Sequence, residues 1–315
     1  MNKWAQRFRN SMSSNHLFHA VTHSSKFHAD DVLATVVLKK VYPQLKFTRT
    51  RDSDLVASAD IVYDLGGVYD HQARRYDHHQ IGSRKREDTG LTYSAFGLIW
   101  DHYGLDYCQG NNEVWRYVDN LLVKGIDAND NGEAEEEIGS NAPQFTMPQI
   151  INHLNPLSGS DEDYDKQFWV AVDLASGILE RMVARLGNDF EVAKQVRSAQ
   201  QSSIDTRYAE LDKAIVMNDM ISNIDGLEFL LFPDKVLNTW RLYAVNVAGS
   251  TYDVKRPFPE SWAGLRDDDL VRVTGIGDAV FCHKNRFLTV AKSRAGALAL
   301  LNLVLDQDDN GKVES

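Results

Sequence analysis

The sequence is short of cysteine, of long apolar runs and of positive charge. Its two cysteines, Cys108 and Cys282, exclude a disulfide framework and a four-thiolate zinc site, and they favour a reducing compartment. No apolar run approaches the roughly 18 residues of a transmembrane helix, so we expect no membrane contact. The formal net charge of −11 argues against wholesale coating of a polyanion. Local basic loops around bound cations could still hold a phosphate.

The N-terminus lacks acidic residues and an apolar core. Residues 1–15 contain Lys3, Arg7 and Arg9, a composition that faintly resembles an organellar transit peptide but not a secretion signal. We expect a frayed N-terminus on a cytoplasmic protein, with organellar targeting as the alternative.

What the sequence does contain is typical of a folded globular protein. Hydrophobic residues make up 43% and charged residues 25% of the 315 residues. This length suggests two domains rather than one small core. There is no internal repeat, and the only biased tract is the acidic run at 133–137.

The first half of the chain alternates strand-like and helix-like segments. Strands are expected at residues 16–22, 45–50 and 59–67. A helix after the first strand would place four apolar residues on one face: Leu33, Val36, Val37 and Val41. This order predicts an α/β layer with a largely parallel sheet, in which ligands bind at the carboxyl ends of the strands.

The middle of the chain is predicted to be mainly helical. Helices are expected at 91–104 and 112–127, an irregular acidic segment at 128–165, an amphipathic helix at 168–186 and a polar helical connector at 188–212.

The last third predicts a smaller domain with mixed strands. Its expected strands lie in "AIVM" (214–217), "LEFLLF" (227–232), "WRLYAVNV" (240–247) and "AVFCHKNRFLTVA" (279–291), before a helix at 294–305. We therefore expect an α/β protein with a first domain at residues 1–205, which includes the connector helix, and a smaller mixed α/β domain at residues 206–315.

Aspartate and histidine gather where the apolar segments end. Four segments present them: His23, His28, Asp30 and Asp31; Asp64; Asp77, His78 and His79; and Asp127, with Asp130 close behind. Mixed imidazole and carboxylate ligands suit an ion such as manganese and suit calcium less well. Six or seven such groups are enough for two ions about 3.5–4 Å apart, which would activate a water and clamp the oxygens of a phosphoryl group.

Each of these residues also has a simpler interpretation. His23 alone could be a hydrogen-bonded strand-end histidine, and Asp30 with Asp31 could favour a helix start through its dipole. Asp64 before two glycines could be a turn residue and Asp127 a helix-end acid. The ordered combination H-x4-H-x-D, D-x-G-G, D-H-H and a later aspartate favours the metal site.

This ordered set resembles the DHH phosphoesterase superfamily, which includes single-strand-specific exonucleases and manganese pyrophosphatases. Longer stretches resemble the melanocyte proliferating gene family within it. They are "THSSKFHADDVLA" (22–34), "RTRDSDLVASADIVYDLGGVYD" (49–70), "RRYDHHQ" (74–80), "RPFPESWAGLRDDDL" (256–270) and "GDAVFCHKNRF" (277–287). The resemblance covers nearly the whole chain. It implies that residues 1–205 are the metal-binding catalytic DHH domain and that residues 206–315 are the substrate-binding domain, which faces it across a cleft.

The resemblance also implies roles for single residues. His23, His28 and Asp64 would hold one ion, while Asp30, Asp64, His78 and Asp127 would hold the other, with Asp64 bridging. His79 would contact the scissile phosphate or protonate the leaving oxygen, and Asp77 would orient a ligand imidazole. The sequence departs from most of the superfamily at His28, where an aspartate is usual, and after His79, where "QIGSRKRED" replaces a shorter turn.

Basic and aromatic residues have two interpretations. The run Arg84-Lys85-Arg86 is typical of a solvated loop, although its position beside the histidine pair keeps phosphate binding open. In the second domain, Trp262 and Phe281 belong either to a base-stacking surface or to the core. The resemblance favours a substrate-binding role for Arg256 and His283, with Lys284 beside them.

The residues by themselves predict a two-metal phosphoester hydrolase. The resemblance implies a 3′–5′ exonuclease that hydrolyses RNA or short single-stranded oligonucleotides, with two manganese ions, or magnesium as the alternative. A phosphatase or pyrophosphatase acting on a small nucleotide or on pyrophosphate is the second hypothesis. A non-catalytic, metal-dependent RNA-binding protein is the third. Oligomeric state and the choice between RNA and DNA are left open by the sequence.

Overall fold

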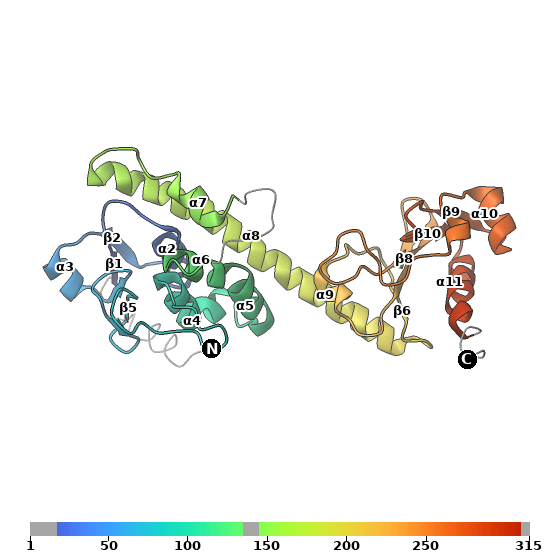
Figure 1. Ribbon diagram of the computed structural model, residues 1–315, viewed down its shortest axis with the longest axis horizontal. Coiled ribbons are helices and arrows are strands. Elements are labelled where there is room, and N and C mark those ends of the chain that lie inside the picture. The colour runs from blue at the N-terminus through green and yellow to red at the C-terminus, as the bar shows by residue number, and fades with distance from the viewer. Residues whose placement is uncertain (1–17, 135–144, 310–315) are drawn as a thin grey trace. The chain divides into compact units, whose positions relative to one another are not determined.

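The chain forms two compact units, residues 1–187 and 188–315, in a computed structural model that describes residues 18–134 and 145–309. The division falls inside α8 (Asp161–Ser202), a single helix of 42 residues (Figure 1). This helix joins the two helical segments that the sequence predicts on either side of residue 187. The predicted domain boundary at 205 and 206 lies just past its end and stays a prediction.

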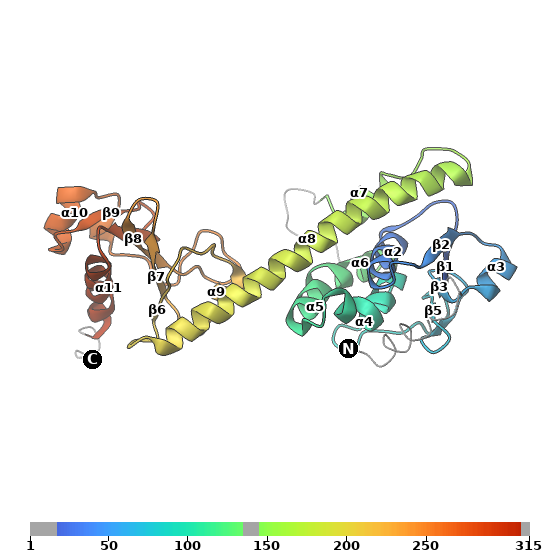
Figure 2. The ribbon, with the colours of Figure 1, turned by 180° about the vertical axis from the view of Figure 1, so that it is seen from behind.

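The first unit is built on a five-stranded sheet in the order β2-β1-β3-β5-β4. Figure 2 labels β1, β2, β3 and β5 of this sheet. The strands are β1 (His19–Thr22), β2 (Lys46–Arg49), β3 (Ile61–Tyr63), β4 (Tyr69–Asp70) and β5 (Arg75–Tyr76). In the parallel register Ala20 lies opposite Phe47 on β2 and Ile61 on β3. Strand β5 is parallel to β3, and only β4 runs antiparallel, so the largely parallel sheet is confirmed.

Helices α2 (Ala29–Val41) and α4 (Ala95–Tyr107) pack together in this unit. The N-cap of α2 is His28, whose backbone N–H donates to Asp31 Oδ1 over 2.9 Å, as in a capping box. Ser94 caps α4, which starts four residues later than the sequence predicts. The expected helix at 112–127 is present as α5 (Asn112–Val118), a π-helical turn (Asp119–Val123) and α6 (Lys124–Asp130), and α3 (Ser53–Ser58) is added.

The segment 128–165, predicted to be irregular, contains a short helix, α7 (Met147–Asn152). Its start is stabilised by Gln149, whose Oε1 accepts hydrogen bonds from the backbone N–H and hydroxyl of Thr146 at 2.8 and 3.2 Å. This local capping outweighs the turn-rich composition on which the prediction rested. Part of the acidic run at 133–137 lies outside the described residues.

The predicted apolar face of α8 packs in the core of the first unit. Phe168, Val172, Ala175 and Leu179 are buried, and Phe168 meets Phe27 edge to face at 5.7 Å between ring centroids. Further along the same helix, Ala193 and Val196 belong to a core cluster of the second unit. None of the described helices combines the length and apolar character that a bilayer span requires.

The second unit contains a mixed five-stranded sheet in the order β6-β7-β8-β10-β9. The strands are β6 (Tyr208–Glu210), β7 (Phe229–Asp234), β8 (Thr239–Ala244), β9 (Ala279–Cys282) and β10 (Leu288–Ala291). Its helices are α9 (Asp219–Ser222), the 3-10 turn η2 (Glu260–Trp262), α10 (Asp267–Thr274) and α11 (Arg294–Asp309). The expected mixed α/β character is confirmed.

The predicted strand "AIVM" is wrong. Residues 214–217 form no strand, and β6 instead pairs in parallel with β7. Ile215 and Met217 still pack against the core cluster around Leu230. The apolar residues of this segment are therefore explained by packing against the core and not by strand pairing. The edge of β7 is already paired with β6.

Candidate metal centre

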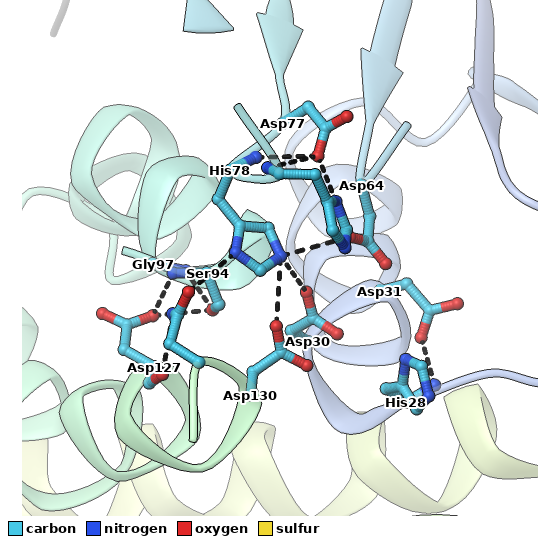
Figure 3. Close-up of polar contacts among 12 residues, drawn as sticks. His28, Asp30, Asp31, Asp64, Asp77, His78, Ser94, Gly97, Asp127 and Asp130 are labelled. Atoms are coloured by element: carbon cyan, nitrogen blue, oxygen red, sulfur yellow. Dashed lines mark hydrogen bonds and ion pairs between the residues drawn. The ribbon is translucent and has the colours of Figure 1, made fainter. Parts of the chain in front are cut away.

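The ends of three parallel strands and the start of α2 bring the acidic and imidazole side chains together (Figure 3). His23 follows β1, Asp64 follows β3, and Asp77, His78 and His79 follow β5. Helix α2 adds His28, Asp30 and Asp31, and the end of α6 adds Asp130. The groups with ligand atoms within 4.8 Å of one another are His23, His28 and Asp64; His28, Asp30 and Asp130; Asp30, Asp31 and Asp64; and Asp64, Asp77, His78 and His79.

Three carboxylates are buried side by side in this cluster. Asp30, Asp31 and Asp64 are 1%, 0% and 3% exposed. Both oxygens of Asp30, Oδ2 of Asp31 and Oδ1 of Asp64 have no hydrogen-bond partner among the residues that the structure describes. Buried acceptors without donors are costly, and like charges at this spacing add repulsion. Divalent cations would bind the unpartnered oxygens and neutralise the repulsion between the carboxylates, so these residues fit a metal site.

The pKa values show how this charge is distributed in the metal-free protein. Burial, reinforced by Asp64 and Asp130, raises the pKa of Asp30 well above its usual range. Burial also raises the pKa of Asp31 to about 7, against the opposing effect of His23. At Asp64 burial acts in the same direction, but the neighbouring imidazoles of His23 and His78 outweigh it and lower the pKa. Without cations the cluster therefore retains protons on some carboxyls while Asp64 stays ionised.

Asp64 lies between two imidazoles. Its Oδ2 is 3.0 Å from Nε2 of His23, and its Oδ1 is 3.4 Å from Nε2 of His78. Its backbone has φ of 53°, in the left-handed region that few non-glycine residues adopt. The backbone N–H donates to the carbonyl of Tyr76 over 3.0 Å, which fixes the turn at the end of β3. This position suits the bridging role that the family resemblance implies for Asp64.

His78 is held by an amide. Its Nε2 lies 3.1 Å from Oδ2 of Asp130 (Figure 3). Its Nδ1 hydrogen-bonds with Oδ1 of Asn131 over 3.1 Å. The Asn131 amide donates to the carbonyls of Thr92 and Asp127, so its oxygen must face the ring and accept. This arrangement places the proton on Nδ1 and leaves the Nε2 lone pair for a cation. In the metal-free protein burial lowers the pKa of His78, but the carboxylates of Asp130 and Asp64 outweigh burial and raise it to about 11.

Asp77 holds His79 rather than His78. Its Oδ1 hydrogen-bonds with Nδ1 of His79 at 2.6 Å and accepts from the backbone N–H groups of His78 and His79 at 2.7 and 3.2 Å. Its Oδ2 accepts from the backbone of Gly67 at 2.5 Å. The His79 side chain is 61% exposed, whereas that of Asp77 is buried. Asp77 thus orients the exposed imidazole of His79, while Asn131 orients the buried imidazole of His78.

Asp127, predicted as a ligand, lies apart from the cluster (Figure 3). Its Oδ1 accepts from the backbone and hydroxyl of Ser94 at 2.9 and 2.6 Å, and its Oδ2 accepts from Nε of Arg86 at 2.7 Å. A Cβ at position 97 would lie 2.3 Å from this carboxylate, so Gly97 makes room for it. Both oxygens are therefore satisfied by the protein. Asp130, one turn later on α6, lies beside His78. The ligand role of Asp127 stays a prediction.

Two of the three basic residues at 84–86 form ion pairs with aspartates of the first unit. Arg86 is buried, donates to Asp127 and to Asp119 (2.8 Å), and stacks on the Tyr93 ring at 4.5 Å. Arg84 donates to Asp101 over 2.7 Å. Lys85 is exposed and forms no ion pair with any residue that the structure describes. A freely solvated loop therefore describes Lys85 but not the two arginines.

The three predicted substrate-binding residues belong to the second unit. Arg256 donates to Glu228 over 3.2 Å and to the carbonyl of Val304. The His283 ring packs against Phe287 at 4.3 Å, and Lys284 is exposed. Trp262 is buried in the core of this unit. The substrate roles of Arg256, His283 and Lys284 stay predictions.

Known proteins match this chain along most of its length. The model of a family described as "Uncharacterised protein family (UPF0160)" matches residues 19–305, which extend over both units. The "MYG1 protein" of Chlamydia trachomatis is 32% identical over 297 residues, covering 91% of this chain and 96% of the relative. The "MYG1 exonuclease" of Homo sapiens is 29% identical over 328 residues, covering 91% of this chain and 85% of the relative. A solved structure, a pGpG-specific phosphodiesterase of Vibrio cholerae, aligns with a TM-score of 0.32 at 12% identity over 93% of this chain and 99% of that one.

Proposed function

This chain belongs to the MYG1 family (UPF0160), and we propose that it is a two-metal phosphoesterase that degrades RNA or short single strands in the 3′–5′ direction. The observation that carries the proposal is the group of buried carboxylates Asp30, Asp31 and Asp64, whose oxygens lack partners among the described residues. A nucleic-acid substrate is supported by the name of the human relative, an exonuclease.

The proposed ligand sets follow the geometry of the cluster. His23, His28 and Asp64 would hold one cation, and Asp30, Asp64, His78 and Asp130 the other. Manganese suits this mixture of imidazole and carboxylate, with magnesium as the alternative. When bound, two such ions lower the pKa of a water and neutralise charge on a phosphoryl group.

His79 is the proposed proton donor. Because its Nδ1 is engaged by Asp77, its Nε2 is the nitrogen that can deliver a proton to a leaving oxygen. Its exposed ring can reach a bound substrate, whereas the ring of His78 is buried. Asp77 and Asn131 act as positioning residues for these two imidazoles.

A reducing cytoplasmic compartment is part of the proposal. Cys108 and Cys282 are both free and buried, and burial raises the pKa of the Cys108 thiol to about 12 and that of Cys282 to about 11. Such thiols are unreactive and need no oxidising environment.

The proposal is tested by hydrolysis with metal-stripped, manganese-reloaded protein. The substrates are a labelled single-stranded RNA, its DNA counterpart and pyrophosphate. We expect stepwise shortening of the RNA from its 3′ end, and a loss of about 100-fold in His79→Ala with manganese content unchanged.

The control is His153→Ala, which removes an exposed imidazole outside the metal cluster and should leave the rate unchanged. Phosphate release from pyrophosphate without RNA cleavage would replace the exonuclease with the small-substrate enzyme. RNA binding without hydrolysis of any substrate would favour the non-catalytic hypothesis.

A further inference from the structure

A cavity of about 310 Å³ opens beside the metal cluster, within the first unit. It is lined from three helices: α2 with His28, α6 with Asn129 and Asp130, and α7 with Gln149 and Asn152. Two of these residues, His28 and Asp130, also belong to the proposed ligand sets. A group in this cavity would therefore lie next to a phosphate bound at the cations.

Besides the His28 imidazole and the Asp130 carboxylate, the cavity presents three side-chain amides. Those of Asn129 and Asn152 make no hydrogen bond to any residue that the structure describes. The Gln149 oxygen is used by Thr146, so its amide nitrogen remains as a donor. Amides offer a donor and an acceptor side by side, which is the pattern that matches the edge of a nucleobase.

The charge of the cavity disfavours a second phosphate as its occupant. None of the described residues that line it is lysine or arginine, and the carboxylate of Asp130 would repel an anion. Ala29, Ile126 and Pro148 provide apolar wall, against which the face of a flat ring can pack. The cavity volume lies at the lower end of the range for ligand pockets, which is about 300–1,000 Å³.

We propose that this cavity receives the nucleobase of the nucleotide next to the scissile phosphate. Asn129, Gln149 and Asn152 hydrogen-bond its edge and determine base preference. This inference rests on the proposed function, because it needs a nucleotide at the metal centre.

Binding, rather than turnover, tests it. The manganese-loaded full-length protein is titrated by calorimetry with the four ribonucleoside 5′-monophosphates and with ribose 5-phosphate, which carries no base. We expect at least one nucleotide to bind about tenfold more tightly than ribose 5-phosphate. In Asn152→Ala and Asn129→Ala this ratio should fall toward one, with manganese content unchanged. Gln44→Ala, which removes an exposed amide elsewhere in the same unit, should keep the native ratio.

Two outcomes would overturn the inference. One is equal affinity of the native protein for nucleotides and ribose 5-phosphate. The other is a variant that weakens both ligands alike, because that effect would lie at the metal centre. Base-dependent binding without any RNA hydrolysis would support nucleobase binding in the cavity and would contradict the proposed exonuclease activity instead.

Discussion

At Asp64 one carboxylate meets two imidazoles, 3.0 Å from His23 and 3.4 Å from His78. It is buried, and Oδ1 has no hydrogen-bond partner among the described residues. At the residue scale, the cluster therefore depends on the charge of Asp64 more than on its shape. His79, which is exposed and tied to Asp77, is suited to proton transfer instead.

We expect Asp64→Asn to lose both manganese and activity, with hydrolysis falling more than about 100-fold. Asparagine has nearly the same shape and tolerates the left-handed backbone at this position, so the change tests charge rather than strain. Manganese per chain is measured by mass spectrometry beside the rate. Asp54→Asn, on the exposed surface of α3, serves as the control. Two ions retained in Asp64→Asn would contradict a bridging role.

At the scale of the element, α6 presents two aspartates three residues apart to different environments. Asp127 binds Ser94 and Arg86 in the interior, and Asp130 lies beside His78 at the metal cluster. Burial raises the pKa of Asp127 to about 6, against the opposing charge of Arg86. The same helix turn thus carries one structural acid and one candidate ligand.

We therefore expect Asp127→Ala to lose mainly stability and Asp130→Ala to lose mainly manganese. Removing Asp127 leaves Arg86 buried without that partner and should lower the free energy of unfolding by about 3 kcal/mol. Removing Asp130 should lower manganese content with little loss of stability. Urea denaturation of the metal-free proteins, together with metal analysis, separates the two effects. The reverse assignment, with metal loss in Asp127→Ala alone, would restore Asp127 as the ligand.

At the scale of the whole molecule, the cluster links metal binding to folding. Burial raises the pKa of Asp31 from 3.8 to about 7, so folding favours its protonated form. The stability that this gives is complete below pH 3.8 and is lost as the pH rises through about 7. His78, with a pKa of about 11, loses its contribution in the same direction at higher pH.

The metal-free protein should therefore be less stable at about pH 8 than at about pH 5. For Asp31 alone the stability lost between these two pH values amounts to about 3 kcal/mol. Manganese should reverse the trend, because cations bind the ionised carboxylates. Melting temperatures with chelator and with manganese at both pH values measure the effect. Asp31→Asn should flatten the chelator series, and a melting temperature that rises with pH in the metal-free protein would contradict the prediction.

Local patterns in the sequence were enough to predict most strands of the first sheet and the residue types that gather at their ends. Apolar runs at strand spacing predicted β1, β2 and β3, and polar residues directly after them predicted a cluster at the carboxyl ends of a parallel sheet. Residues from His23 to His79 could be found in this way, because strand period and strand ends are local properties of the chain. The family motifs then narrowed the candidates to single positions.

Long-range packing determines which acids lie in the Asp/His cluster, and which side chains hydrogen-bond to the imidazoles of His78 and His79. Asp127 and Asp130 are three residues apart, so both lie on the same side of α6, and no local pattern separates them. Their environments differ because Ser94 and Arg86, which are 33 and 41 residues from Asp127 in sequence, pack against one acid and not the other. The pairs His78 with Asn131 and His79 with Asp77 were decided in the same way, because hydrogen bonds depend on packing in three dimensions.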